Sequence, residues 1–132
     1  MTQRVLKDPQ PTAETQAFWD ATKEGKFIVR TCSDCGKAHW YPRTRCPFCS
    51  SNKTKWVAAS GKGTIYSYSV MRREDPIYVM AYVTLDEGPT MMTNLVDCDP
   101  DALTIGDPVE ISFQKTTGIY SLPMFTPMTG EK

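Results

Sequence analysis

Four of the five cysteines form two CxxC pairs, Cys32 with Cys35 and Cys46 with Cys49, and ten residues separate the pairs. Four thiolates can enclose one tetrahedral zinc ion, and each CxxC turn lets two sulfurs reach the same ion. Because sulfur would fill all four positions, none is left for a substrate or an activated water. The spacing therefore predicts one structural zinc ion per chain and places any chemistry elsewhere.

The cysteines leave three other interpretations open. A thioredoxin-like redox site needs one CxxC at the start of a helix in a βαβ unit, and both pairs lie in turn-rich, polar sequence. Two disulfides need an oxidising compartment, whereas the start of the chain lacks the apolar stretch of a signal peptide. We therefore expect a cytoplasmic protein with zinc. Iron in the same cage stays open, because donor softness and geometry do not separate the two metals.

Cys98 and His39 are the other groups that could do chemistry. The acidic neighbours Asp97 and Asp99 would raise the pKa of Cys98, which is the wrong direction for a nucleophile. His39, the one histidine, lies between the two cysteine pairs, and we interpret it as a surface residue because a base needs a substrate pocket around it. The sequence therefore predicts no catalytic residue.

Charge is distributed unevenly along the 132 residues, which are enough for one domain or two very small ones. Residues 1–62 carry eleven Lys/Arg and five Asp/Glu, a net charge of +6, whereas residues 63–132 carry four and ten, a net charge of −6. An acidic half repels a phosphate backbone, so we do not expect nucleic acid as a partner. No apolar run approaches the roughly 20 residues that span a bilayer, so we expect no membrane segment.

The first half of the chain predicts a helix followed by a zinc ribbon. After an N-terminal arm, a helix is expected over 12–24, capped by Thr12 and ended by Gly25. Its apolar face would comprise Ala13, Ala17, Phe18 and Ala21, with Trp19 at the edge. Strands expected at 27–30, 37–41 and 54–57 flank the two cysteine turns, which is the order of a rubredoxin-like zinc ribbon over 26–59. Because this unit holds few apolar residues, metal binding should supply most of its folding free energy.

The second half predicts a small barrel. Ser60 to Gly63 mark a break in composition, and five strands follow at 64–71, 77–85, 90–96, 109–114 and 118–124, with a helical turn at 100–103. This count matches an OB-fold barrel. Tyr66, Tyr68 and Val70 share one face of the first strand, and we expect the tyrosines in the core. The chain thus divides into an arm and helix (1–25), a ribbon (26–59) and a mostly β barrel with a tail (60–132).

The C-terminal tail predicts an interface. Residues 122–128 place apolar side chains between two prolines, which disfavour pairing in a central strand. Phe and Met are enriched in interface cores. We therefore predict that Met124, Phe125 and Met128, together with Phe18 and Trp19, lie on a partner surface. The alternative is that both segments fold back over the barrel.

The order of these parts resembles a known family. Phe18-Trp19 precede the paired CxxC turns, Tyr41-Pro42-Arg43 lie between them, and residues 61–67 (Gly-Lys-Gly-Thr-Ile-Tyr-Ser) and 105–109 (Ile-Gly-Asp-Pro-Val) follow. Over roughly residues 14–125, this is similar to the stand-alone OB-fold family with a rubredoxin-like zinc ribbon, catalogued as domain-of-unknown-function family 35. All four cysteines match, so the resemblance implies the same metal site.

The resemblance also implies a function. Members of that family are associated with acyl-CoA metabolism, as small subunits of thiolases, thiolase-like acyltransferases and retro-aldolases of steroid or aromatic side-chain breakdown. It thus implies a non-catalytic subunit bound to a thiolase-like protein, with CoA or acyl-CoA as the ligand of the complex. Candidate contacts for the CoA phosphates or the partner are Lys37, Arg43, Arg45, Trp40 and Tyr41; a solvated basic face around the metal is the alternative. A retro-aldolase subunit, a single-strand nucleic-acid-binding module and a free-standing enzyme are the other functions that we considered.

Overall fold

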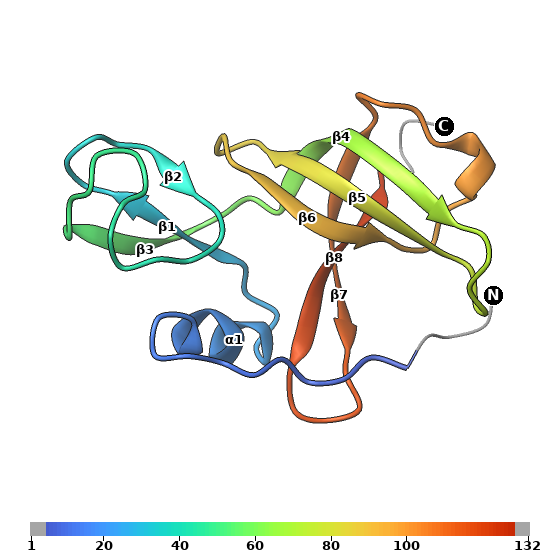
Figure 1. Ribbon diagram of the computed structural model, residues 1–132, viewed down its shortest axis with the longest axis horizontal. Coiled ribbons are helices and arrows are strands. Elements are labelled where there is room, and N and C mark those ends of the chain that lie inside the picture. Colours follow the sequence, from blue (N-terminus) through green and yellow to red (C-terminus); the bar gives the residue numbers. More distant parts are fainter. Residues whose placement is uncertain (1–4, 129–132) are drawn as a thin grey trace.

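The chain folds into a small sheet and a closed barrel, seen in a computed structural model that describes residues 5–128 (Figure 1). Helix α1 (Gln16–Thr22) precedes a three-stranded sheet of order β2-β1-β3, built from β1 (Ile28–Cys32), β2 (Ala38–His39) and β3 (Thr54–Ala58). The barrel has the order β4-β5-β6-β8-β7 and contains β4 (Lys62–Met71), β5 (Tyr78–Leu85), β6 (Thr90–Leu95), the 3₁₀ turn η1 (Pro100–Ala102), β7 (Pro108–Lys115) and β8 (Ser121–Pro127). The predicted fold, a helix, a four-cysteine ribbon and a five-stranded barrel, is confirmed.

Helix α1 is shorter than the sequence predicts. Thr12 begins a turn whose carbonyl accepts from the N–H groups of Thr15 and Gln16, and regular helix begins only at Gln16. The helix ends at Thr22, two residues before the predicted end, and Gly25, at φ +71°, closes the turn that follows it. Its buried face holds the aromatic Phe18 and Trp19 together with two threonines, whereas the predicted alanines 13 and 17 are exposed, because the large rings decide which side packs inward. No helix within residues 5–128 is long and apolar enough to cross a membrane.

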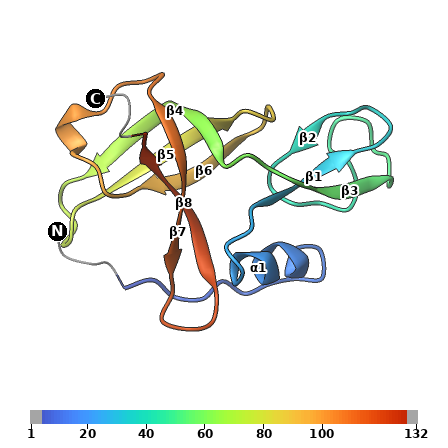
Figure 2. The same ribbon diagram turned by 180° about the vertical axis from the view of Figure 1, so that it is seen from behind.

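An aromatic cluster joins the helix, the ribbon and the barrel into one core. The ring of Phe27, just before β1, lies 6.2 Å from Phe18 of α1, 6.4 Å from Phe113 of β7 and 6.2 Å from Phe125 of β8, measured between ring centroids. Trp40 completes it from the ribbon, 5.1 Å from Phe18. Figures 1 and 2 show α1 lying beside the long β7–β8 hairpin and beneath the ribbon. The position of the ribbon against the barrel is therefore set by ring packing as well as by the chain linker.

Alternation decides which barrel side chains point inward, except where a bulge intervenes. On β5, Val79, Val83 and Leu85 are buried, as their period of two predicts. On β4, the register with β5 shifts between Ile65 and Ser67. The extra residue reverses the alternation, so Tyr66 is 65% exposed although Tyr68 packs against the core. The prediction that Tyr66 faces the core is wrong for this reason.

Strand β8 overturns the prediction of an exposed tail. It pairs antiparallel with β7 from Ser121 to Pro127, and Phe125 is fully buried in the core of the barrel, whereas Met124 is 7% exposed on the opposite face of the strand. The prolines are tolerated because β8 is registered with β6 at one pair only, Leu95 with Phe125, so few backbone N–H groups are required on that side. Met128 is half-buried, and its N–H donates to the carbonyl of Pro108.

The aromatic residues of helix α1 are buried as well. Phe18 is 0% exposed and Trp19 is 8% exposed, and both pack within the aromatic cluster. Phe18 and Phe125 are fully buried within the chain, so these two side chains do not form a partner surface. The alternative interpretation, in which the helix and the tail fold back over the barrel, describes the structure.

Candidate metal centre

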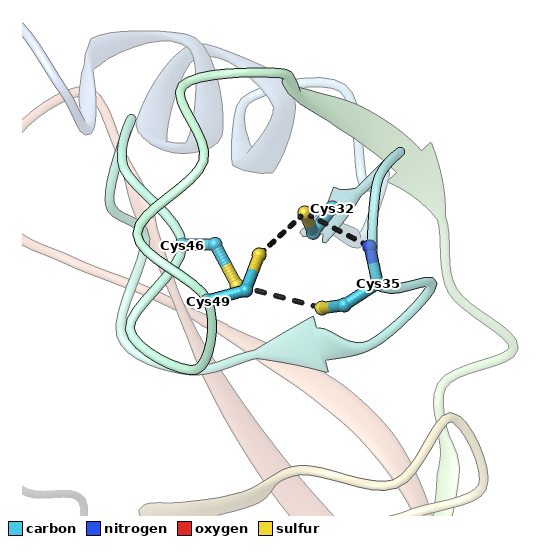
Figure 3. Close-up of side chains that lie close together, drawn as sticks. All are labelled: Cys32, Cys35, Cys46 and Cys49. Atoms are coloured by element: carbon cyan, nitrogen blue, oxygen red, sulfur yellow. Dashed lines mark hydrogen bonds between the residues drawn. The ribbon is translucent and has the colours of Figure 1, made fainter.

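The four cysteines of the two CxxC pairs converge at one end of the ribbon, with all four sulfurs within 4.8 Å of one another (Figure 3). Cys32 ends β1, and the chain reverses through Gly36, whose φ is +77° and whose N–H donates to the carbonyl of Cys32. The second turn repeats this geometry with Ser50, at φ +65°, donating to the carbonyl of Cys46. Two turns of the same shape therefore present two sulfurs each, from opposite sides.

The geometry of the sulfurs fits a tetrahedral ion. Zinc–sulfur bonds of about 2.3 Å place the corners of a tetrahedron about 3.8 Å apart. The Sγ atoms of Cys32 and Cys49 are 3.6 Å apart, and those of Cys35 and Cys46 are 3.7 Å apart. The predicted structural zinc site is therefore supported, with sulfur at every position.

Electrostatics also favour a cation at the centre of the four sulfurs. The N–H of Cys35, 3.4 Å from the sulfur, leads the effects that lower the pKa of Cys32 to about 7. The N–H of Ser51 lowers the pKa of Cys49, but the neighbouring thiol of Cys32, burial and the other cysteines raise it to about 12. Four thiolates this close together repel one another, so the sulfurs are not all deprotonated in the absence of a cation. A divalent ion at their centre offsets this repulsion. Cys32 and Cys46 are buried, whereas Cys35 and Cys49 are exposed.

His39 is buried, which corrects its interpretation as a surface residue. It is 2% exposed in β2, opposite Arg30 of β1. Its Nε2 accepts from the N–H of Arg43 at 3.3 Å and lies 3.2 Å from the carbonyl oxygen of the same residue. Its Nδ1 has no hydrogen-bond partner in the described part of the chain. His39 thus fixes the loop that leads to the second cysteine pair, and the side chain is not open to a substrate.

The burial of His39 makes stability depend on pH. Burial lowers the pKa of His39, and the charges of Arg30 and Arg43 act in the same direction. Below about pH 6.5 the imidazole of His39 is therefore protonated in the unfolded chain but not in the folded chain. The free energy of unfolding should fall as the pH drops through about 6.5. We expect the free energy of unfolding of the zinc-loaded protein, measured with urea, to fall less between pH 7.5 and pH 5.5 in His39→Gln than in the unchanged protein. Equal losses in both proteins would contradict this.

Cys98 lies outside the metal site and is half-buried. Burial raises the pKa of its thiol, and Asp97 and Asp99 raise it further, so the predicted direction is confirmed although burial is the larger cause. Its thiol therefore stays protonated at neutral pH.

The five residues suggested for CoA or partner contact fall into two groups. Lys37 and Arg45 lie on the cysteine turns, where Lys37 stacks on Phe48 and Arg45 donates to the carbonyl of Ser50. The other group lies at the junction of the ribbon and the barrel. There the guanidinium of Arg43 lies 5.8 Å from the ring of Tyr41, which in turn contacts Trp40.

Sequence reasoning missed a groove at this junction. It has a volume of about 710 Å³ and is lined by fourteen residues from α1, the loop after β2, and strands β5, β6 and β8. Trp19, Trp40 and Tyr41 form its ribbon side, and Tyr82 and Met92 form its barrel side. The signal was present in β5, where both faces are apolar. The outer face of a barrel strand is covered only when something lies over it, so a second apolar face on this strand indicates an exposed apolar surface.

Sequence comparison matches both parts of the chain to known domains. Residues 19–54 match the profile of the rubredoxin-like zinc ribbon domain of ChsH2, and residues 56–114 match that of the C-terminal OB-fold domain of ChsH2. The two matches follow each other along the chain in the order that the fold shows.

Individual relatives agree with the profiles. A DUF35 domain-containing scaffold protein of Methanothermobacter thermautotrophicus is 41% identical over 91 residues, 64% of this chain and 68% of the relative. A probable enoyl-CoA hydratase alpha subunit of Thermomonospora curvata is 35% identical over 127 residues, 90% of this chain but 40% of the relative, so the chain spans about two fifths of that protein.

A solved structure described as "Ltp2-ChsH2(DUF35) aldolase" superposes with a TM-score of 0.80 at 31% identity, over 91% of this chain and 98% of the matched chain. Similarity of sequence and structure therefore extends across the helix, the ribbon and the barrel. The chain belongs to the DUF35 family, with the zinc ribbon and OB-fold domains of ChsH2.

Proposed function

We propose that this chain is a non-catalytic subunit of a hetero-oligomeric, thiolase-like enzyme that acts on acyl-CoA. The observation that carries the proposal is the superposition over nearly the whole matched chain of the aldolase structure. The site chemistry is consistent with it, because the metal centre is closed by four sulfurs and His39 is buried. Thiolase chemistry needs an activated cysteine and an acid–base pair, which we assign to the partner.

The chain would support CoA binding as well as assembly. Lys37 and Arg45 lie on the cysteine turns and make no ion pair with any residue in 5–128. Cations of this kind suit the phosphates of CoA. We propose Lys37 and Arg45 as contacts for the CoA phosphates, and Arg43, Trp40 and Tyr41 as contacts for the partner subunit.

The reaction class distinguishes two versions of this proposal. In one, the complex carries out thiolytic or acyl-transfer carbon–carbon chemistry in side-chain or aromatic degradation. In the other, it is a retro-aldolase of steroid-type side-chain cleavage, which the description of the superposed structure favours. Both versions need the same two subunits, and they differ in the substrate that the partner cleaves.

A nucleic-acid-binding role is the second candidate. Tyr66 and Tyr82 are 65% and 46% exposed, so stacking surfaces do exist. However, the groove beside Tyr82 is lined by no Lys or Arg. Single-strand binding needs a basic groove along the backbone, so we expect only weak, salt-sensitive binding.

The test is reconstitution. The tagged chain is purified from its native cells, and the subunit that co-purifies is identified by mass spectrometry and produced separately. We expect the chain alone to show no turnover of a 3-oxoacyl-CoA with CoA or of a 3-hydroxyacyl-CoA, and the combined subunits to turn over one of them. Turnover by the chain alone, a partner unrelated to thiolases, or salt-resistant submicromolar binding of single-stranded DNA would contradict the proposal.

A further inference from the structure

The groove between the ribbon and the barrel carries large apolar side chains that face water. We call it the composite groove, defined by Trp19, Trp40 and Tyr41 on the ribbon side and by Tyr82 and Met92 on the barrel side. Tyr82 of β5 lies opposite Met92 of β6 in the strand register, and the two are 46% and 56% exposed. Their inward neighbours Val83 and Met91 are almost fully buried, so the exposure follows from strand alternation and is not a local irregularity.

The composite groove is free of charge in a chain in which 23% of the residues are charged. None of its fourteen lining residues is Asp, Glu, Lys, Arg or His. Phosphate groups of CoA or of nucleic acid need cations, so this lining does not suit them. Depletion of charge with enrichment of Tyr, Trp and Met is the composition of the core of a protein interface.

A cation, Arg43, lies beside Tyr41 at the ribbon side of the composite groove. Arg43 is exposed and its guanidinium lies 5.8 Å from the ring of Tyr41; it forms no salt bridge within residues 5–128, and Glu14 interacts with its charge only at longer range. A complementary surface would therefore be apolar at its centre and would carry a carboxylate at the edge that meets Arg43. An apolar centre with a charged rim is the usual arrangement of a protein–protein interface.

We propose that the composite groove is the docking site of the thiolase-like subunit. That subunit inserts apolar side chains between Tyr41, Tyr82 and Met92 and sets a carboxylate against Arg43. The inference rests on the proposed function, since it names the surface through which the accessory chain would act. It also explains why the ribbon and the barrel are held together by one aromatic cluster: both walls of the groove must keep their spacing.

The test measures the dissociation constant between the purified chain and the purified co-purifying subunit. Tyr82→Arg and Met92→Arg place a charge in the groove, and we expect each to weaken binding about 30-fold or more, the size of an interface hot spot. The matched controls are Ile105→Arg and Ile119→Arg, which are 64% and 65% exposed outside the groove and should change binding less than about twofold. Zinc content and circular dichroism show that each variant is folded.

A reversal of charge at the rim supplies an independent readout. Arg43→Glu should weaken binding and reduce its dependence on salt, because the ion pair with the partner is lost. Groove variants that bind as tightly as the controls would overturn the docking site while leaving the proposed function intact. A thiolase-like subunit that does not bind the chain at all would overturn both. If Tyr82→Arg instead dissociates a dimer of this chain in sedimentation, the occupant is a second copy and the proposal is wrong.

Discussion

Replacement of Cys46 by serine should remove the zinc and unfold the ribbon. The three-stranded sheet is short, and β2 contains only two residues. Val29 is the one apolar residue of its three strands, other than cysteine, that is fully buried. The binding free energy of a structural zinc, about 10–16 kcal/mol, is comparable with the whole stability of a small domain. Losing one of four thiolates should therefore cost most of the folding free energy of this unit.

The effect of Cys46→Ser is measured by elemental analysis and by two-dimensional NMR of the purified protein. We expect zinc well below one per chain and the loss of dispersed signals from residues 28–58, with barrel signals retained. Cys98→Ser is the control, because Cys98 lies outside the site and should leave one zinc per chain. A Cys46→Ser protein with full zinc and an intact ribbon would refute the assignment of the metal as the main source of ribbon stability.

Replacement of Phe27 by alanine should be the most damaging change in the apolar core. The ring is 6% exposed and stands within 6.4 Å of Phe18, Trp40, Phe113 and Phe125, so it contacts the helix, the ribbon and both strands of the β7–β8 hairpin. Truncating a buried phenylalanine leaves a cavity and costs about 3–5 kcal/mol. The loss should also loosen the ribbon from the barrel, because no other residue in the described part of the chain contacts so many rings of this cluster.

Urea unfolding with zinc present measures the change for Phe27→Ala. The control is Phe48→Ala, which removes the same ring where it is 59% exposed and stacked on Lys37, and which should cost less than about 1 kcal/mol. Similar losses for the two variants would show that Phe27 does not carry the junction. A stable Phe27→Ala protein with weakened binding to the partner would locate its role in the spacing of the composite groove.

The metal site could be predicted from the sequence because its information is local. Two CxxC turns, each short enough to bring two sulfurs to one ion, specify the ligands and their number without reference to the rest of the chain. The barrel strands were also predictable in number, since their alternation and the turns between them are written in short segments. The sequence did not predict that Gly36 and Ser50 take the same place in the two cysteine turns, because a serine at positive φ carries no sequence signal of its own.

The sequence by itself determined the ligands, the order of the parts and the family to which they belong. Only the tertiary structure decided which apolar side chains are buried within the chain and which remain exposed. Phe125 is buried in β8, and Tyr66 is turned outward by the bulge in β4. The physical reason is that burial depends on contacts between residues far apart in sequence, and a shift of one residue in strand register reverses the direction of a side chain.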